Sequence, residues 1–220
     1  TAGAKLVLVD AVYFKGAWGT AFDKARTAEA DFHTSPGNPV KVQMMKLTGE
    51  GASFNYAESE GLKILELPYK NDRLSMLMLL PPPGGMKELE SSLSPEKLAA
   101  WKAELSNERV DVFLPRFVLN AKYELPATLA EMGMPTAFTM QADFSGMDGK
   151  KDLYIRQVVH QGFVEVNEEG TEAAAATGVS MELKSMPMQA PRFRADRPFL
   201  FLIQERETSR IVFMGRVEKP

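Results

Sequence analysis

The residues able to do chemistry are few, and their spacing gives little support for an enzyme. The chain has no Cys and only two His, His33 and His160. These counts exclude disulfides, a thiol nucleophile and thiolate–zinc ligation, and they argue against a multi-histidine metal site. Ser145, followed by Gly146, would be a nucleophile with His160 as its base, but the Gly-x-Ser-x-Gly turn that positions such a serine is absent. We therefore expect Ser145 to be a turn residue and His160 a structural histidine.

Two neighbouring carboxylates, Glu168 and Glu169, would be the other candidates for acid–base chemistry. Neighbouring residues on an extended chain point to opposite sides, so a solvated or ion-paired role is the better interpretation. No phosphate-binding loop, dinucleotide glycine fingerprint or paired-histidine zinc helix occurs in the sequence. We expect a protein that is not an enzyme and that needs no cofactor and no metal.

The composition is that of an ordinary globular protein. Of 220 residues, 45% are hydrophobic and 25% are charged, and 26 Lys+Arg against 29 Asp+Glu give a net charge of −3. A near-neutral balance argues against nucleic acid or a membrane as partner, because both need a strong positive field. The apolar run 6–14 is too short to span a bilayer, and it lacks the basic start and cleavage site of a signal peptide.

Strand-like runs dominate the chain, which predicts an α+β fold with large, mostly antiparallel sheets. These runs are rich in β-branched and aromatic residues and are separated by turn residues. The predicted strands are 6–14, 40–46, 62–68, 74–80, 110–119, 153–166, 199–204 and 211–217. Ser94 followed by Pro95 predicts a capped helix reaching to Leu105, and shorter helices are expected over 86–93 and 124–132.

The first run, 6–14, has apolar residues at successive positions, which predicts a strand buried on both faces. Such a strand needs neighbours, and nothing precedes it in this chain. We therefore expect the chain to be the latter part of a longer domain.

The segment 168–178, EEGTEAAAATG, fits neither an ordinary strand nor an ordinary loop. Its four alanines favour a helix by propensity. Against this, glycines bracket the run, Thr171 and Thr177 are β-branched, and no apolar stripe would hold a helix to a core. The residues up to 194 are polar, Met-rich and interrupted by two prolines. An exposed stretch of about two dozen residues between two strands is usually functional or disordered.

Residues 158–177 resemble the proximal hinge of an inhibitory serpin, and further serpin motifs follow the family order along the chain. They are DAVYFKGAW at 10–18, LELPY at 65–69, LPRF at 114–117, ADFSG at 142–146, RPFLF at 197–201 and FMGRV at 213–217. The resemblance implies a single serpin domain over 1–220, incomplete at its N-terminus because the family's N-terminal helices are missing. It also implies that residues 168–194 are the hinge and the exposed reactive-centre loop.

A serpin's loop is bait for a serine protease, so the resemblance implies a suicide inhibitor and not a catalyst. Cleavage would let the proximal half of the loop insert as a strand in the large sheet and trap a covalent acyl-enzyme. The native full-length protein is then expected to be a metastable monomer that is liable to form loop–sheet polymers. Its partner would be a serine protease, and by family resemblance we expect it to be extracellular.

The predicted hinge suits insertion because its side chains are small. With a period of two, one face is uncharged and suits burial, while Glu172 lies on the other face and can stay in water. A charge on the first face should block entry, because burying an unpaired charge costs several kcal/mol. The hinge residues are Glu168, Glu169, Gly170, Thr171, Glu172, Ala173, Ala174, Ala175, Ala176 and Thr177.

Counting fifteen residues from Gly170 inclusive, as the family counts, places the scissile bond between Lys184 and Ser185. A Lys there would fill the acidic specificity pocket of a trypsin-like protease. A bond one residue earlier would present Leu183 to a chymotrypsin-like protease instead. The plainer alternative is that Lys184 is a solvated loop lysine.

The match implies two structural sites. Asp10 and His160 fall where the family keeps a central cluster that controls how the large sheet parts; Asp10 replaces the usual Asn, and a buried carboxylate would favour protonated His160. Two satisfied core polar residues are the plainer alternative. Glu168 and Arg116 match a pair near Trp18, where insertion begins, although an exposed pair would contribute little.

A different class remains open, a serpin-fold carrier or chaperone that inhibits nothing. Non-inhibitory members of the family typically carry a spoiled hinge. The intact segment from Thr171 to Thr177 therefore weighs against this class.

Overall fold

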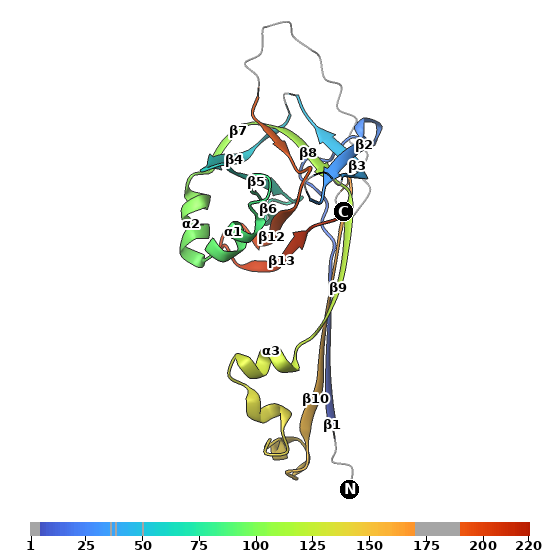
Figure 1. Cartoon of the computed structure of the whole chain (residues 1–220), viewed down its shortest axis with the longest axis vertical. Helices are drawn as coiled ribbons and strands as arrows, with labels where there is room; N and C mark the ends of the chain where they lie inside the picture. The colour runs from blue at the N-terminus through green and yellow to red at the C-terminus, as the bar shows by residue number, and fades with distance from the viewer. Residues whose placement is uncertain (1–4, 36, 38, 50, 170–189) are drawn as a thin grey trace, which may run out of the picture. The chain divides into compact units, whose positions relative to one another are not determined.

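The computed structural model describes residues 5–35, 37, 39–49, 51–169 and 190–220 (Figure 1). These residues form an α+β fold, as the sequence predicts, and they divide into two compact units. The first unit comprises residues 1–14 and 118–164, and the second comprises 15–117 and 165–220. The hinge positions 170–177 and the predicted bond between Lys184 and Ser185 lie outside the described residues.

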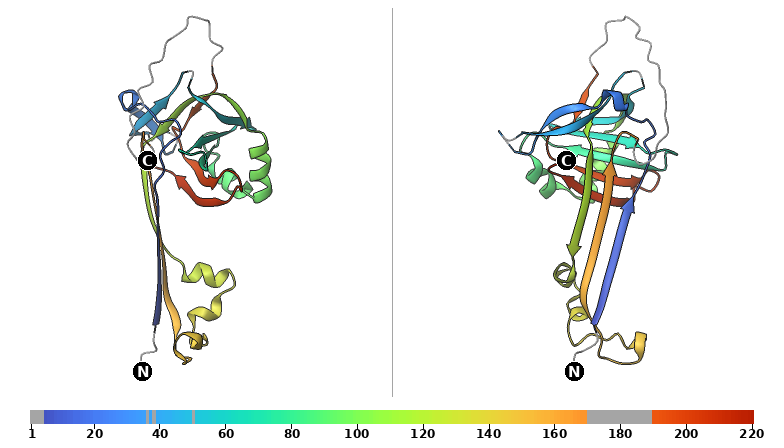
Figure 2. Two further views of the ribbon diagram at one scale, coloured as in Figure 1. Left: turned by 180° about the vertical axis from the view of Figure 1, so that it is seen from behind. Right: turned by 90° about the vertical axis from the view of Figure 1, so that its right-hand side faces the viewer.

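The first unit is built on a three-stranded sheet in the order β1-β10-β9 (Figure 2, right). Strand β1 (Lys5–Phe14) runs parallel to β10 (Tyr154–Val166), with Asp10 directly opposite His160 in the register. Strand β9 (Phe117–Glu124) lies on the other side of β10. Between β9 and β10 the chain forms α3 (Pro126–Glu131), the 3₁₀ turn η2 (Pro135–Phe138) and α4 (Ser145–Asp148).

The prediction that strand 6–14 is buried on both faces is wrong for this chain. Val7, Leu8 and Val9 are 54%, 47% and 71% exposed, and Tyr13 is 58% exposed. These positions alternate between the two faces of β1, so both faces are open among the described residues of this unit. Pairing with β10 covers one edge of β1, and the physical reason for the exposure is that no described element of this unit covers its faces at these positions.

The second unit contains a six-stranded antiparallel sheet in the order β13-β12-β6-β5-β4-β7. Its strands are β4 (Ser53–Ser59), β5 (Leu62–Pro68), β6 (Leu74–Leu80), β7 (Ser106–Arg109), β12 (Phe199–Glu205) and β13 (Ile211–Val217). The near-continuous apolar runs of β5, β6 and β12 are buried on both faces. This sheet therefore supplies most of the core.

Two helices cover one face of that sheet, as Figure 1 shows. Helix α1 (Met86–Ser92) contributes Leu89, and α2 (Pro95–Ala103) contributes Trp101 to a buried cluster on the strands. The predicted cap of α2 is confirmed, because the Ser94 hydroxyl accepts a hydrogen bond from the Lys97 N–H at 3.1 Å. The side chains of the strands in this cluster are Ala57, Leu62, Ile64, Leu77, Leu79, Leu200 and Leu202.

A four-stranded sheet in the order β11-β8-β3-β2 completes the second unit. Its strands are β2 (Ala28–His33), β3 (Pro39–Leu47), β8 (Asp111–Pro115) and β11 (Arg192–Arg194). The strand predicted over 110–119 is therefore two strands, β8 and β9, with Arg116 between them. The Arg116 N–H donates to the Gln43 carbonyl at 2.8 Å, and its side chain turns to a carboxylate described below.

The core assignment makes a direct prediction about two isoleucines of the same sheet. Ile64 is fully buried under the helices, whereas Ile211 on β13 is 43% exposed. Ile64→Ala should lower the free energy of unfolding by about 2–5 kcal/mol, because it leaves a cavity. Ile211→Ala is the matched control and should cost less than about 1 kcal/mol. Urea unfolding followed by circular dichroism measures both, and equal losses would contradict this assignment.

Candidate functional site

The candidate site lies where β10 ends, at a carboxylate that is almost completely buried. The Glu168 side chain is 1% exposed, and its two oxygens accept hydrogen bonds from Arg116 Nε at 2.7 and 2.8 Å. A second Arg116 nitrogen, Nη2, also contacts Glu168 Oε1. The Thr27 hydroxyl donates to the same oxygen. A buried carboxylate is tolerated only with such partners, so this cluster fixes the Glu168 side chain.

Trp18 holds the neighbouring backbone in place. Its indole N–H donates to the Asn167 carbonyl at 2.9 Å, and its backbone N–H donates to the Glu169 carbonyl at 3.1 Å. The Trp18 ring stacks on Tyr69, with centroids 4.6 Å apart and the planes 8° from parallel. Trp18 is 5% exposed, so these contacts are buried and fix residues 167–169 within the second unit.

Two further contacts complete this attachment. The Phe22 N–H donates to the Glu168 carbonyl at 2.8 Å, and Lys24 forms an ion pair with the Glu169 carboxylate. Glu168 and Glu169 are therefore both ion-paired, to different cations. Both the backbone and the side chains of the last residues before Gly170 are thus held by residues 17–27 and Arg116.

The electrostatics of Glu168 follow from this geometry. Burial alone would raise its pKa, but the hydrogen bonds from Arg116 and Thr27 outweigh burial and hold the pKa of Glu168 below its ordinary value of 4.5. The carboxylate stays ionised at neutral pH and keeps its guanidinium partner. Such a group is an anchor; it is poorly suited to act as a general acid or base at neutral pH, which needs a pKa near the working pH.

Asp10 and His160 are brought together in the first unit. The His160 Nδ1 atom lies 2.8 Å from Asp10 Oδ2, and the His160 ring stacks on Tyr123 with centroids 6.5 Å apart. The Asp10 side chain is 68% exposed and that of His160 is 37% exposed. The burial expected for this pair is therefore wrong for this chain, because both faces of β1 are open; the role in sheet opening stays a prediction.

Ser145 and His160 do not form the nucleophile–base pair that an enzyme would need. The Ser145 hydroxyl donates to Asp143 at 2.6 Å, two residues earlier, and the Ser145 N–H contacts the same carboxylate at 3.1 Å. This is the turn geometry expected from the sequence. Within the part of the chain that the structure describes, no group of three or more His, Asp or Glu is placed to hold a metal ion. Over the same residues, no helix is long and apolar enough to cross a membrane.

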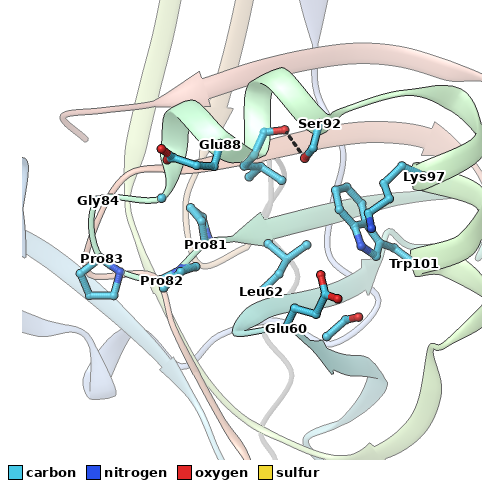
Figure 3. A pocket seen from close by; sticks show the side chains of 13 residues that line it. Glu60, Leu62, Pro81, Pro82, Pro83, Gly84, Glu88, Ser92, Lys97 and Trp101 are labelled. Atoms are coloured by element: carbon cyan, nitrogen blue, oxygen red, sulfur yellow. Dashed lines mark hydrogen bonds between the residues drawn. The ribbon is translucent and has the colours of Figure 1, made fainter.

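A pocket of about 540 Å³ lies elsewhere in the second unit, between the 81–85 loop and the two helices (Figure 3). Its floor is apolar, with Leu62 and Trp101, and its polar groups include Glu60, Glu88 and Lys97. Figure 3 shows the two carboxylates on different sides of the apolar floor. None of the predicted site residues lines this pocket, so it has no part in the cluster around Glu168.

The sequence did not indicate five participants in this site: Phe22, Lys24, Thr27, Tyr69 and the Asn167 carbonyl. Thr27 is a single threonine with no motif around it, and its role depends on a contact with a residue 141 positions away. Tyr69 lies within the LELPY motif, which carried the family resemblance but no role. A backbone acceptor such as the Asn167 carbonyl cannot be predicted from residue types, because every residue has one.

Fold and site together define an α+β protein in which a buried ion pair fixes the residues that follow β10. The family model described as Serpin (serine protease inhibitor) matches residues 1–220. The chain is 45% identical to serpin B8 of Bos taurus over 220 residues, covering 98% of this chain and 58% of that protein. It is 41% identical to a serine protease inhibitor of Cyanea capillata, and the match covers 98% of this chain and 57% of that protein. The chain belongs to the serpin family.

Solved structures agree with this assignment. Uncleaved ovalbumin matches with a TM-score of 0.84 at 36% identity, covering 97% of this chain and 54% of that one. Human thyroxine-binding globulin matches with a TM-score of 0.88 at 31% identity, and the match covers 100% of this chain and 57% of that one. The chain spans a little over half the length of these relatives and is a partial serpin domain.

The expectation of an extracellular location is not supported. The relatives include intracellular serpins such as serpin B8, as well as a protein of the archaeon Thermococcus kodakarensis. The family is mixed in its location, so membership alone assigns no compartment.

Removing Arg116 tests whether the cluster stabilises the fold. Arg116→Ala leaves the buried Glu168 carboxylate without its guanidinium, and we expect a loss of about 1–3 kcal/mol in the free energy of unfolding. The matched control is Arg73→Ala, which breaks a pair with Glu205 whose arginine is 81% exposed. That control should cost about 0–1 kcal/mol. Equal losses in chemical unfolding would contradict the anchoring role of Arg116.

The pKa of Glu168 gives a second prediction, for pH. A carboxyl group whose pKa is lower in the folded than in the unfolded state stabilises the fold at pH values above its unfolded-state pKa. This stabilisation is lost as the pH falls through the folded-state pKa. The difference in unfolding free energy between the parent and Glu168→Gln should therefore be constant above about pH 5 and shrink below 4.5. Urea unfolding curves recorded at about six pH values between pH 3 and pH 8 measure this difference in unfolding free energy. A difference that does not change with pH would contradict this.

Proposed function

We propose that this chain is the major part of an inhibitory serpin that traps a trypsin-like serine protease as a covalent acyl-enzyme. The observation that carries the proposal is the segment 168–177, whose first residue is the buried, ion-paired Glu168. Family membership supports serine protease inhibition in general. The fold alone does not select inhibition, because thyroxine-binding globulin shares it.

The proposed reaction uses the chemistry of the protease. Its serine hydroxyl attacks the Lys184 carbonyl, the peptide bond to Ser185 breaks, and the new amine of Ser185 leaves with a proton. The product is an ester between the protease serine and Lys184. Water would normally hydrolyse this ester and regenerate the protease. Inhibition requires the loop to leave its place before that water attacks.

The sheet of the first unit offers a place for the released loop. Strands β1 and β10 are parallel neighbours, and the loop follows directly from the end of β10. A segment folding back between them would run antiparallel to both, which replaces one parallel ladder by two antiparallel ones. The net gain is therefore one row, and at about 0.5–1.5 kcal/mol net per hydrogen bond a row along a strand as long as β1, 10 residues, contributes on the order of 10 kcal/mol. That energy would drag and distort the attached protease.

The cluster around Glu168 limits what must move. Residues 167–169 are held by Trp18, Phe22 and Arg116, so the chain can pivot only from Gly170 onward. Gly170 is a suitable pivot because glycine has the widest range of backbone conformations. The uncharged face that starts at Thr171 then enters the sheet first.

Incubation of the whole protein with trypsin tests the proposal. A complex that survives SDS should appear on a denaturing gel, because an ester resists detergent. Cleavage near Lys184 without such a complex would contradict inhibition and favour a serpin-fold binding or chaperone protein. Turnover of a peptide ester in the absence of protease would point to an enzyme.

Two arginine substitutions at neighbouring positions test the insertion step. Thr171→Arg places a charge on the face that enters the sheet, so the variant should be cleaved as a substrate, with at least a tenfold loss of SDS-stable complex, as expected from a burial cost above about 1.4 kcal/mol. Glu172→Arg carries the same side chain on the opposite face and should keep most of the complex. Equal complex yields from the two variants would contradict the insertion of this face.

A further inference from the structure

A cluster of three cations surrounds one aromatic ring on the four-stranded sheet of the second unit. Phe113 lies on β8, with Lys46 of β3 and Arg194 of β11 as its direct partners on either side. Lys46 Nζ lies 5.8 Å from the ring centroid, and the guanidinium carbons of Arg192 and Arg194 lie 5.5 and 5.2 Å from it. Arg192 is two residues from Arg194 on the same strand, so both point to the face that Phe113 occupies.

The charges of this cluster are only partly balanced. Arg194 pairs with Asp196 at 3.1 Å, but neither Lys46 nor Arg192 forms an ion pair within the described part of the chain. The negative face of a ring offsets a nearby cation only by about 0.5–1 kcal/mol at an exposed site. Arg192 is exposed, and Phe113, Lys46 and Arg194 are half-buried. Two cations are therefore available to an external anion beside a partly open aromatic ring.

The backbone that carries these side chains is held firmly. The Asp111 N–H donates to the Pro191 carbonyl at 2.9 Å, and the Ala195 N–H donates to the Phe113 carbonyl at 2.9 Å. Lys63 Nζ also donates to the Arg192 carbonyl at 2.8 Å. Because β11 is fixed on both sides of Arg192, its backbone needs little further ordering on binding.

We propose that Lys46, Arg192 and Arg194 around Phe113 form a docking surface for an acidic segment of the protease that attacks the loop. Carboxylates suit it, because guanidinium groups bind them with two parallel hydrogen bonds. A long sulfated polysaccharide suits it less, because Asp111 and Asp196 flank the cations and the chain carries a net charge of −3. A short acidic segment meets fewer of these carboxylates than a long polysaccharide does.

The position of the cluster along the chain supports this partner, and in this respect the proposal rests on the proposed function. Arg192 follows the predicted residue Ser185 by seven positions (192 − 185). Seven residues span at most about 25 Å. A domain of protease size is about 45 Å across. A protease bound at the bond between Lys184 and Ser185 is therefore large enough to reach Arg192.

The test compares two double variants of the whole protein that remove the same charge. Lys46→Gln/Arg192→Gln removes two cations of the cluster; Lys87→Gln/Arg210→Gln removes two exposed cations of α1 and the β12–β13 turn. Association rates are measured with a panel of trypsin-family proteases whose surfaces differ in acidity. At low salt the first variant should lose about tenfold in rate toward the acidic proteases alone, and the control should lose little. The loss should shrink at about 0.5 M NaCl.

A binding experiment without protease tests the docking surface independently of the proposed function. Octa-glutamate, titrated by calorimetry, should bind the parent and the control variant but bind the cluster variant at least tenfold more weakly. If SDS-stable complexes form and neither the rates nor octa-glutamate binding differ between the variants, the docking surface is refuted and the proposed function stands. If octa-glutamate binding depends on the cluster but no protease in the panel forms a complex, the proposed function and the protease as partner both fail. Binding of a heparin octasaccharide in place of octa-glutamate would overturn the choice of an acidic protein segment.

Discussion

The buried carboxylate of Glu168 is the interaction on which the rest of the site depends. An ionised group that is 1% exposed is stable only while Arg116 and Thr27 remain bound to it, so these three residues form one unit. Trp18 and Phe22 hold the adjacent backbone. The cluster fixes the chain directly after β10 and determines the residue from which the chain is free to change its path. The proposed inhibitory cycle needs such a fixed point, because a strand can enter a sheet in register only from one.

The second constraint is the pairing of β1 with β10. In the described part of the chain, β1 has β10 as its one strand neighbour, and its side chains at Val7, Leu8, Val9 and Tyr13 are exposed. On the proposed mechanism, the parallel ladder between these strands must open, and Asp10 and His160 face each other across it. An ion pair or hydrogen bond between facing strands adds to the barrier for opening. This geometry gives the two residues a physical route to the gating role that the family resemblance implies.

Much of the fold could be predicted from residue patterns, and the failures have physical reasons. Strands β5, β6 and β13 match their predicted limits, because apolar runs bounded by turn residues are local signals. The strands β2, β4, β7 and β11 were missed, since they are short or mixed in polarity and are stabilised by their neighbours. The break at Arg116 was missed because it depends on a partner 52 residues away. The site was reached only through long motifs, since Thr27 and a backbone carbonyl carry no local signal.

Mass spectrometry of the products formed with trypsin tests the central claim most directly. The account predicts one species in which the protease is joined by an ester to a fragment ending at Lys184, together with a released peptide beginning at Ser185. Intact free protease together with two cleaved fragments, and no joined species at any time point, would contradict it.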